Sequence, residues 1–309
     1  MFISQLKNSL NTYDRFYEHR INGLKAVFVL ELLFLFNFIY TIPNPYFYYF
    51  YIPLTAFAAE VAGNTLSEKY LFYFYTVIGS IITIFLFGVI SSYKSIFVIF
   101  VFFYSLFIYL IAVYKFKNIF IPAPIILSLG AYSLIYGLND SNFYIALNHA
   151  LQTIVAMIIV FIGLLFFPKY YYFCIWRNGF DDVLTKIEEL TAQISQGNHI
   201  TIPIIPGTII MERYSKMLSS RTKKFSILKI TLLSFDLVMS VSYLASFQNQ
   251  LRAPYIIFLH RYILALKEAY KKRMPLSINE HDLQIFNETH ELKVLHQLIL
   301  SWNYLCYKN

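Results

Sequence analysis

The chain has 309 residues, of which 58% are hydrophobic and only 14% are charged. A soluble globular domain has about half apolar residues and about 25% charged residues, so this composition excludes an ordinary soluble protein and favours an integral membrane protein. The net charge is +8, and we attribute it to basic residues that flank apolar spans rather than to a nucleic-acid-binding surface.

Charged residues are distributed unevenly along the chain. Few lie in residues 24–168 and most lie in residues 169–309, so we expect the main domain boundary near Pro168. The sequence predicts a cytoplasmic N-terminal segment (1–23), a transmembrane domain (24–168) and a cytoplasmic helical domain (169–309). The first apolar run lacks a small-residue cleavage site after it, so we do not expect it to be a signal peptide.

Six apolar runs are long enough to cross a bilayer, which takes about 20 residues of helix. The second run is short and contains Pro53, and the fifth begins with Pro122 and Pro124, which the first turn of a helix tolerates. The connections are short, so neighbouring spans are expected to be antiparallel. The six predicted spans are 24–43, 46–62, 71–91, 95–114, 119–137 and 143–167.

Lysine and arginine residues collect on one side of this predicted bundle. The opposite side has Lys94 and Asp140. Because cytoplasmic loops carry the excess of positive charge, six spans place both termini in the cytoplasm, and we expect a multi-pass protein of the inner (cytoplasmic) membrane. The residues on the positive side are Lys7, Arg15, Arg20, Lys25, Lys69, Lys115, Lys117, Lys169 and Arg177.

Residues 178–309 have the periodic apolar pattern of soluble helices, which predicts the helical cytoplasmic domain. The stretch 225–247 is apolar enough for a seventh span, but Lys229 and Asp236 would each cost about 2.5–3.5 kcal/mol near the centre of a bilayer. A seventh span would also place the basic C-terminus outside the cell. We therefore favour a buried helix of the cytoplasmic domain, with a membrane span as the alternative.

Four stretches carry a resemblance to a known family. They are Arg20–Lys25 at the entry to span one, Ile42–Tyr46 at the turn into span two, Glu68-Lys69 with Thr76–Ser80 in span three, and Phe167-Pro168 at the end of span six. Together they resemble the fusaric acid resistance (FUSC) family, also called aromatic acid exporters. Where that family has a second glycine in span three, this chain has Thr83.

The resemblance implies a membrane half of about six spans followed by cytoplasmic helices, and efflux of small aromatic organic acids. Many members carry this unit twice, so a half-length chain implies self-association, most simply as a two-fold homodimer. The expected partners are the lipid bilayer, a small organic-acid substrate, a second copy of the chain and an envelope protein. No nucleic acid is expected as a partner.

Four polar side chains in the predicted spans are candidates for a substrate and proton pathway. Glu31 lies in span one, and Asn148, His149 and Gln152 share one broad face of span six. Ionisable groups inside a bilayer are costly and mark ion or proton pathways, and Glu31 and His149 can exchange protons near neutral pH when their surroundings shift their pKa values. Alternatively, these groups join neighbouring helices by hydrogen bonds.

Small residues form stripes on three of the predicted spans. Such residues let helix backbones approach one another closely, and we favour this packing role over the lining of a permeation path. The stripes are Thr76, Gly79, Ser80 and Thr83 in span three, Gly130, Ser133 and Gly137 in span five, and Ala156 and Gly163 in span six.

Catalytic and cofactor motifs are absent from the sequence. It has no Walker A, GxGxxG or GxSxG motif, and His290-Glu291 with His296 lacks the HExxH spacing of a zinc site. We therefore expect no enzyme activity, no cofactor and no metal, and we expect Cys174 and Cys306 to stay reduced. The sequence favours a proton-coupled exporter, and the alternative is a non-transporting membrane scaffold whose cytoplasmic helices bind a protein partner.

Overall fold

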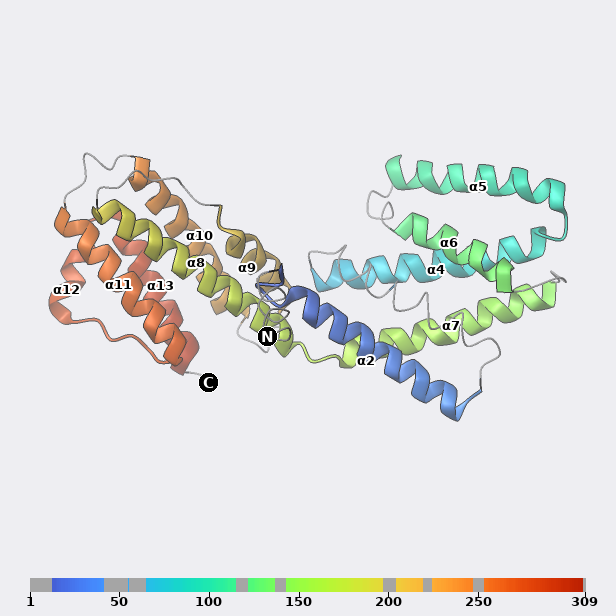
Figure 1. Cartoon of the computed structure of the whole chain (residues 1–309), viewed down its shortest axis with the longest axis horizontal. Coiled ribbons are helices and arrows are strands. Elements are labelled where there is room, and N and C mark those ends of the chain that lie inside the picture. The colour runs from blue at the N-terminus through green and yellow to red at the C-terminus, as the bar shows by residue number, and fades with distance from the viewer. Residues whose placement is uncertain are drawn as a thin grey trace, which may run out of the picture. The chain divides into compact units, whose positions relative to one another are not determined.

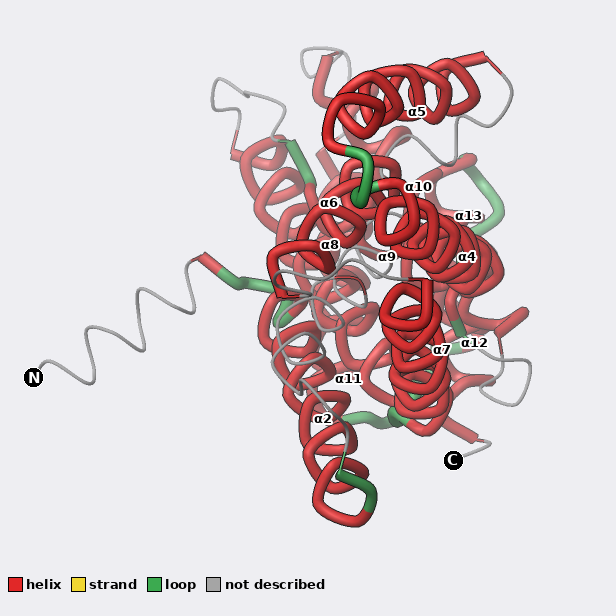
Figure 2. The backbone as a smooth tube through the Cα atoms, turned by 90° about the vertical axis from the view of Figure 1, so that its right-hand side faces the viewer, coloured by secondary structure: helices red, strands yellow, loops and turns green. Residues whose placement is uncertain are grey.

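A computed structural model of the protein describes residues 13–41, 55, 65–114, 122–136, 143–196, 204–218, 224–246 and 253–307. Within these ranges every regular element is a helix (Figure 1, Figure 2), which confirms the predicted all-α class. Tertiary contacts divide the chain into two units. The apolar unit is Glu18–Pro168, and the second unit joins Met1–Tyr17 to Lys169–Asn309.

The described helices of the apolar unit are α2 (Glu18–Ile39), α4 (Leu66–Ile90), α5 (Lys94–Tyr114), α6 (Pro122–Tyr136) and α7 (Phe143–Phe166). The unit is built around α4, which packs against α5, α6 and α7, while α2 packs against α7. In Figure 1 and in the perpendicular view of Figure 2, α4 and α7 lie side by side. This pair of helices forms the groove described below.

Four of the predicted spans appear as helices that are long and apolar enough to cross a membrane, namely α2, α4, α5 and α7. The predicted span 119–137 appears as α6, whose apolar stretch Pro122–Leu134 is shorter. The predicted span 46–62 lies outside the described residues, apart from Thr55. The apolar helices have the length and composition of a multi-pass membrane protein.

The core of the apolar unit lies where α2, α4, α6 and α7 meet. It is formed by Val29, Leu33, Tyr73, Ile84, Leu129, Ala156, Met157, Val160 and Leu164. The outer surface is apolar as well: α5 buries only Ala112 and exposes more than half of the side chains of Phe102, Phe103 and Phe107. So large an exposed apolar surface is unfavourable in water and suits contact with lipid.

Glycines allow the helices of the apolar unit to approach closely. A Cβ atom on Gly79 of α4 would lie 2.5 Å from the Ile126 Cδ1 atom of α6, and a Cβ atom on Gly130 of α6 would collide with α4. A Cβ atom on Gly163 of α7 would lie 3.0 Å from the Leu32 Cδ1 atom of α2. These contacts confirm the packing role predicted for the three glycines.

The described helices of the second unit are α8 (Tyr170–Gln196), α9 (Pro206–Met217), α10 (Lys224–Ser246), α11 (Ala253–Lys272), α12 (Glu280–Ile285) and α13 (His290–Tyr307). α8 packs against α9, α10 and α11, and α13 packs against α10. The buried Trp176 of α8 stacks on Phe180 and donates a 2.9 Å hydrogen bond from Nε1 to the Thr231 hydroxyl of α10. These contacts give α8 its central place in the unit.

α10 has the length and hydropathy of a membrane span, yet it belongs to the second unit. Its buried face packs on α8, α9 and α13, and because α10 also qualifies as a membrane span, the assignment of residues 225–247 to a cytoplasmic domain stays a prediction. The opposite face of α10 is also apolar. Its exposed large residues are Phe225, Leu232, Phe235, Met239 and Tyr243.

Candidate functional site

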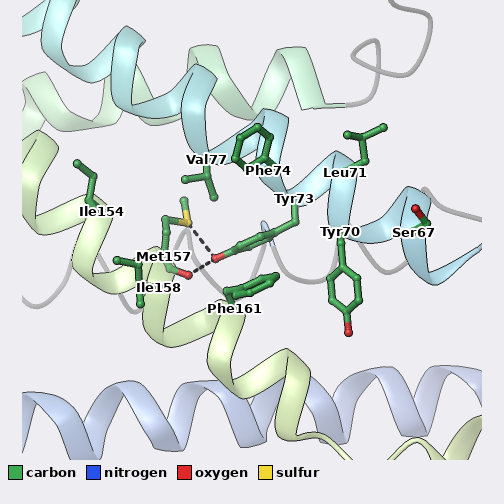
Figure 3. Close-up of a pocket in the computed structure, with 10 residues that line it drawn as sticks. All are labelled: Ser67, Tyr70, Leu71, Tyr73, Phe74, Val77, Ile154, Met157, Ile158 and Phe161. Atoms are coloured by element: carbon green, nitrogen blue, oxygen red, sulfur yellow. Dashed lines mark hydrogen bonds between the residues drawn. The ribbon is translucent and has the colours of Figure 1, made fainter. Parts of the chain in front are cut away.

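A groove of about 470 Å³ lies between α4 and α7 in the apolar unit (Figure 3). Small-molecule sites in proteins are commonly about 300–1,000 Å³ and mostly apolar, with a few polar groups. The lining fits this description, because aromatic and aliphatic side chains dominate it and Ser67 adds a hydroxyl. The lining residues are Ser67, Tyr70, Leu71, Tyr73, Phe74, Val77, Ile154, Met157, Ile158 and Phe161.

Helical spacing places these side chains on facing sides of the two helices. On α4 the residues Ser67, Tyr70 and Phe74 recur at intervals of three and four, and on α7 Ile154 and Ile158 do the same. The start of α4 is fixed by a capping box. The Thr65 hydroxyl accepts a 3.2 Å hydrogen bond from the backbone N–H of Glu68, and the Glu68 carboxylate accepts one from the backbone N–H of Thr65.

Tyr73 and Phe161 form the inner wall of the groove. The buried Tyr73 hydroxyl donates a 2.5 Å hydrogen bond to the backbone carbonyl of Met157, which ties α4 to α7. The Phe161 ring stacks on Tyr73 and meets the Tyr70 ring edge-on. Figure 3 shows the Tyr70 hydroxyl directed away from the Tyr73–Met157 pair. A ligand in the groove therefore meets aromatic faces on its inner side.

The outer rim of the groove is open. Leu71, Phe74 and Ile158 line the groove and are 41%, 56% and 53% exposed. An exposed apolar rim on a helix bundle with this surface is suited to contact with hydrocarbon rather than with water. The groove is therefore open on the side where its rim side chains are exposed.

Two buried lysines lie at one end of the same helix bundle. Lys25 is 6% exposed and lies one turn before Val29 on α2, and Lys69 is 5% exposed and lies one turn before Tyr73 on α4. Val29 and Tyr73 belong to one core cluster, so both lysines sit at the same end of that core. The Lys25 ammonium group lies 5.6 Å from the centre of the Phe167 ring, within the range of a cation–π contact.

The residues predicted from sequence for the pathway lie elsewhere. Glu31 is exposed on α2. On α7, Asn148 is exposed, Gln152 is half-buried, and the Gln152 amide donates a 3.3 Å hydrogen bond to the Asn148 side-chain oxygen. His149 is half-buried, and its backbone carbonyl accepts a hydrogen bond from the Thr153 hydroxyl. None of the four residues is among those that line the groove.

The structure does not bring Glu31 together with the three polar residues of α7. α2 contacts α7 where Leu32 meets Gly163, and Gly163 lies 14 residues beyond His149 on α7. At about 1.5 Å of rise per residue, this separation is about 21 Å along the helix. Glu31 and His149 are therefore at two different levels of the bundle.

The groove itself was not predicted from sequence. The available signal was the run of aromatic residues at helical spacing within 67–77, which in an apolar helix is also the ordinary pattern of a packed face.

Among the described residues, no group of three or more His, Cys, Asp or Glu side chains is placed to hold a metal ion. Comparisons with models of protein families, with curated proteins and with solved structures gave no match.

Proposed function

We propose that the protein is a subunit of a membrane transporter that exports small aromatic organic acids, and that the groove between α4 and α7 receives the substrate ring. The observation that carries this function is the 470 Å³ groove with its aromatic inner wall. The resemblance of the sequence to the fusaric acid resistance family supports the same class of substrate. Aromatic pairs contribute about 0.5–1.5 kcal/mol beyond the burial of their area.

The buried lysines suggest how an acid substrate is distinguished from a neutral aromatic molecule. Lys69 adjoins the groove-lining Tyr70 in sequence, and Lys25 lies at the same end of the core. Both lysines already have interactions within the protein, and a carboxylate at this end adds a charge-assisted contact to one of their ammonium groups. In the proposed complex the ring lies against Phe161 and Phe74, and the carboxylate points to the lysine end.

Proton coupling is assigned to Glu31 and His149 in this proposal. Both are titratable groups in the apolar unit, where such groups commonly mark proton routes. Their different levels on the bundle suit two successive stations of one route, with Asn148 and Gln152 as polar neighbours of His149. The proposed setting is the inner membrane with both termini in the cytoplasm, as a two-fold homodimer that works with an envelope partner.

Flux of labelled benzoate into proteoliposomes, with and without an imposed pH gradient, tests this function. We expect a gradient-driven flux whose KM rises about tenfold in Phe161→Leu and Phe74→Leu, because these changes keep an apolar side chain but remove the aromatic face. Phe102→Leu, on the exposed surface of α5, is the matched control and leaves KM unchanged. Glu31→Gln and His149→Ala abolish the response to the gradient.

The alternative function is a membrane scaffold whose second unit binds a protein partner. The exposed apolar face of α10 favours it, since such faces often mark interaction sites. The same experiment separates the two functions. Folded protein in the correct orientation that carries no benzoate above empty vesicles would exclude the transporter and leave the scaffold.

A further inference from the structure

A second cavity, of about 240 Å³, lies within the second unit. Its walls come from the first turns of α8, from the residue that follows α11, and from the last turns of α13. Tyr170, Phe173 and Trp302 supply aromatic surface, and Arg177 and Arg273 supply two guanidinium groups. Phe173 and Trp302 also pack within the unit, Phe173 on Trp176 and Trp302 on Phe180 and Tyr270, and the two guanidinium groups lie beside these rings.

Both guanidinium groups line the cavity and influence the pKa of the Tyr270 hydroxyl. Burial raises the pKa of the Tyr270 hydroxyl to about 12, and the positive charges of Arg177 and Arg273 oppose this rise, which places both arginines within electrostatic range of Tyr270. Within the part of the chain that the structure describes, neither arginine has a carboxylate within ion-pair distance, Asp181 on the next turn of α8 included. The Asp181 carboxylate also acts on Tyr270 and adds to the rise of its pKa, so the region has two positive charges and one negative charge, with no ion pair between Asp181 and either arginine.

The backbone at Arg273 is unusual. Its φ is 55°, in the left-handed region. The N–H of Arg273 bonds to the carbonyl of Tyr270, and the N–H of Met274 bonds to that of Ala269, which is the hydrogen-bond pattern of a Schellman helix end. Glycine is the residue that takes this position at least cost. An arginine at this position therefore carries a backbone cost that glycine would avoid.

The segment that carries Arg273 is also held firmly in place. The Trp302 Nε1 atom donates a 3.1 Å hydrogen bond to the carbonyl of Met274. The Asn303 side chain accepts a 2.7 Å hydrogen bond from the N–H of Leu276 and donates one of 2.8 Å to its carbonyl. These bonds fix the start of the Arg273 side chain relative to α13, so that the cavity is organised before a ligand arrives.

We propose that this cavity binds a small aromatic carboxylate. Guanidinium groups pair with carboxylates in a planar, bidentate geometry, and Arg177 and Arg273 provide two of them. Tyr170, Phe173 and Trp302 enclose the ring. The site is separate from the groove between α4 and α7, and it does not depend on transport, because every residue that forms it belongs to the second unit.

Tryptophan fluorescence of the intact protein in a non-ionic detergent tests this site. The chain has two tryptophans, Trp176 and Trp302, and both lie in the second unit, so their signal reports this unit. Benzoate is expected to give a saturable one-site change. Benzyl alcohol, which has the ring without the charge, and acetate, which has the charge without the ring, are expected to bind about tenfold more weakly or less.

Two variants remove the guanidinium groups one at a time. Arg273→Gly also gives the left-handed position its preferred residue, so its Tm is expected to stay equal or rise while benzoate affinity falls about tenfold or more. Arg177→Gln is expected to weaken benzoate binding to a similar extent. Lys272→Gln, which removes a neighbouring exposed charge that does not line the cavity, is the control and leaves the affinity unchanged.

Unchanged benzoate affinity in both arginine variants would overturn the proposal. So would inorganic phosphate that binds as tightly as benzoate, because the aromatic walls would then have no role. The groove variant Phe161→Leu is expected to keep the full fluorescence titration, so failure of the transport function and failure of this site are told apart.

Discussion

The Tyr73 hydroxyl of α4 and the backbone carbonyl of Met157 of α7 are 2.5 Å apart. The carbonyl belongs to a helix, so its second lone pair is available to a neighbouring donor. This bond crosses between the two helices that form the groove. It also gives the buried Tyr73 hydroxyl a hydrogen-bond partner. It therefore sets the spacing of α4 and α7 where the aromatic rings meet.

Replacing Tyr73 by phenylalanine removes this bond and keeps the ring. We expect the free energy of unfolding to fall by about 0.5–1.5 kcal/mol, measured by denaturant unfolding in detergent. Tyr93→Phe, at an exposed position just before α5, is the control and should change stability by less than about 0.5 kcal/mol. Equal stability of Tyr73→Phe and wild type would show that the bond contributes nothing.

Two glycines on different helices are expected to respond to alanine in opposite directions. A Cβ atom on Gly88 of α4 would lie 2.5 Å from the Ala146 Cβ atom and 3.2 Å from its Cα atom on α7, so Gly88→Ala must separate the helices, at a cost of about 1–3 kcal/mol. Nothing lies within 4 Å of the corresponding position on Gly23 of α2. Gly23→Ala should stabilise by about 0.5–1 kcal/mol, because alanine is the better helix former.

Thermal unfolding of both variants in one detergent measures this difference. A Tm that falls for Gly88→Ala and rises for Gly23→Ala is the expected result. A Tm that moves equally in both variants would mean that close approach of α4 and α7 at Ala146 does not limit stability.

Asp182 joins separate parts of the second unit. Its Oδ2 atom accepts a 3.0 Å hydrogen bond from the buried backbone N–H of Gly207, and its Oδ1 atom forms an ion pair with Arg15. Asp182→Ala leaves that N–H without its partner and should cost about 1–3 kcal/mol. Asp236→Ala is the control: it breaks a solvent-exposed pair with His290 and should cost less than about 1 kcal/mol. Similar losses in both variants would contradict this role.

The stability of the second unit is expected to depend on pH through His296. This imidazole stacks on the Phe286 ring with 5.1 Å between the centroids, and burial lowers its pKa from the ordinary value. Below a pH of about 6.5 the unfolded chain binds the proton more readily than the folded protein, so stability falls as the pH drops through that value. Above it both states are neutral, and His296 contributes no pH dependence.

Denaturant midpoints of wild type and His296→Gln between about pH 8 and pH 5.5 check this sign. The other histidines contribute to both proteins, so the difference between the two curves isolates His296. We expect the wild type to lose more stability than His296→Gln on acidification. Parallel curves would show that the folded protein protonates His296 as easily as the unfolded chain does.

The sequence by itself determined the long apolar helices. The predicted spans 71–91, 95–114 and 143–167 correspond to α4 (Leu66–Ile90), α5 (Lys94–Tyr114) and α7 (Phe143–Phe166). Their existence follows from composition, because a long apolar run satisfies its backbone polar groups in lipid only as a helix. α2 begins at Glu18, before the predicted 24, since hydropathy detects the apolar part of a helix and not its polar first turns.

Only the tertiary structure decided which faces of these helices meet. α4 and α7 are apolar around most of their circumference, so their hydrophobic pattern carries little information about direction, and the groove that joins Tyr70 and Phe161 could not be read from it. The separation of Glu31 from His149 likewise depends on the place where α2 crosses α7. Arg273 looks like any basic residue in the sequence, and its left-handed backbone exists because α11 ends there and Trp302 holds the segment that follows.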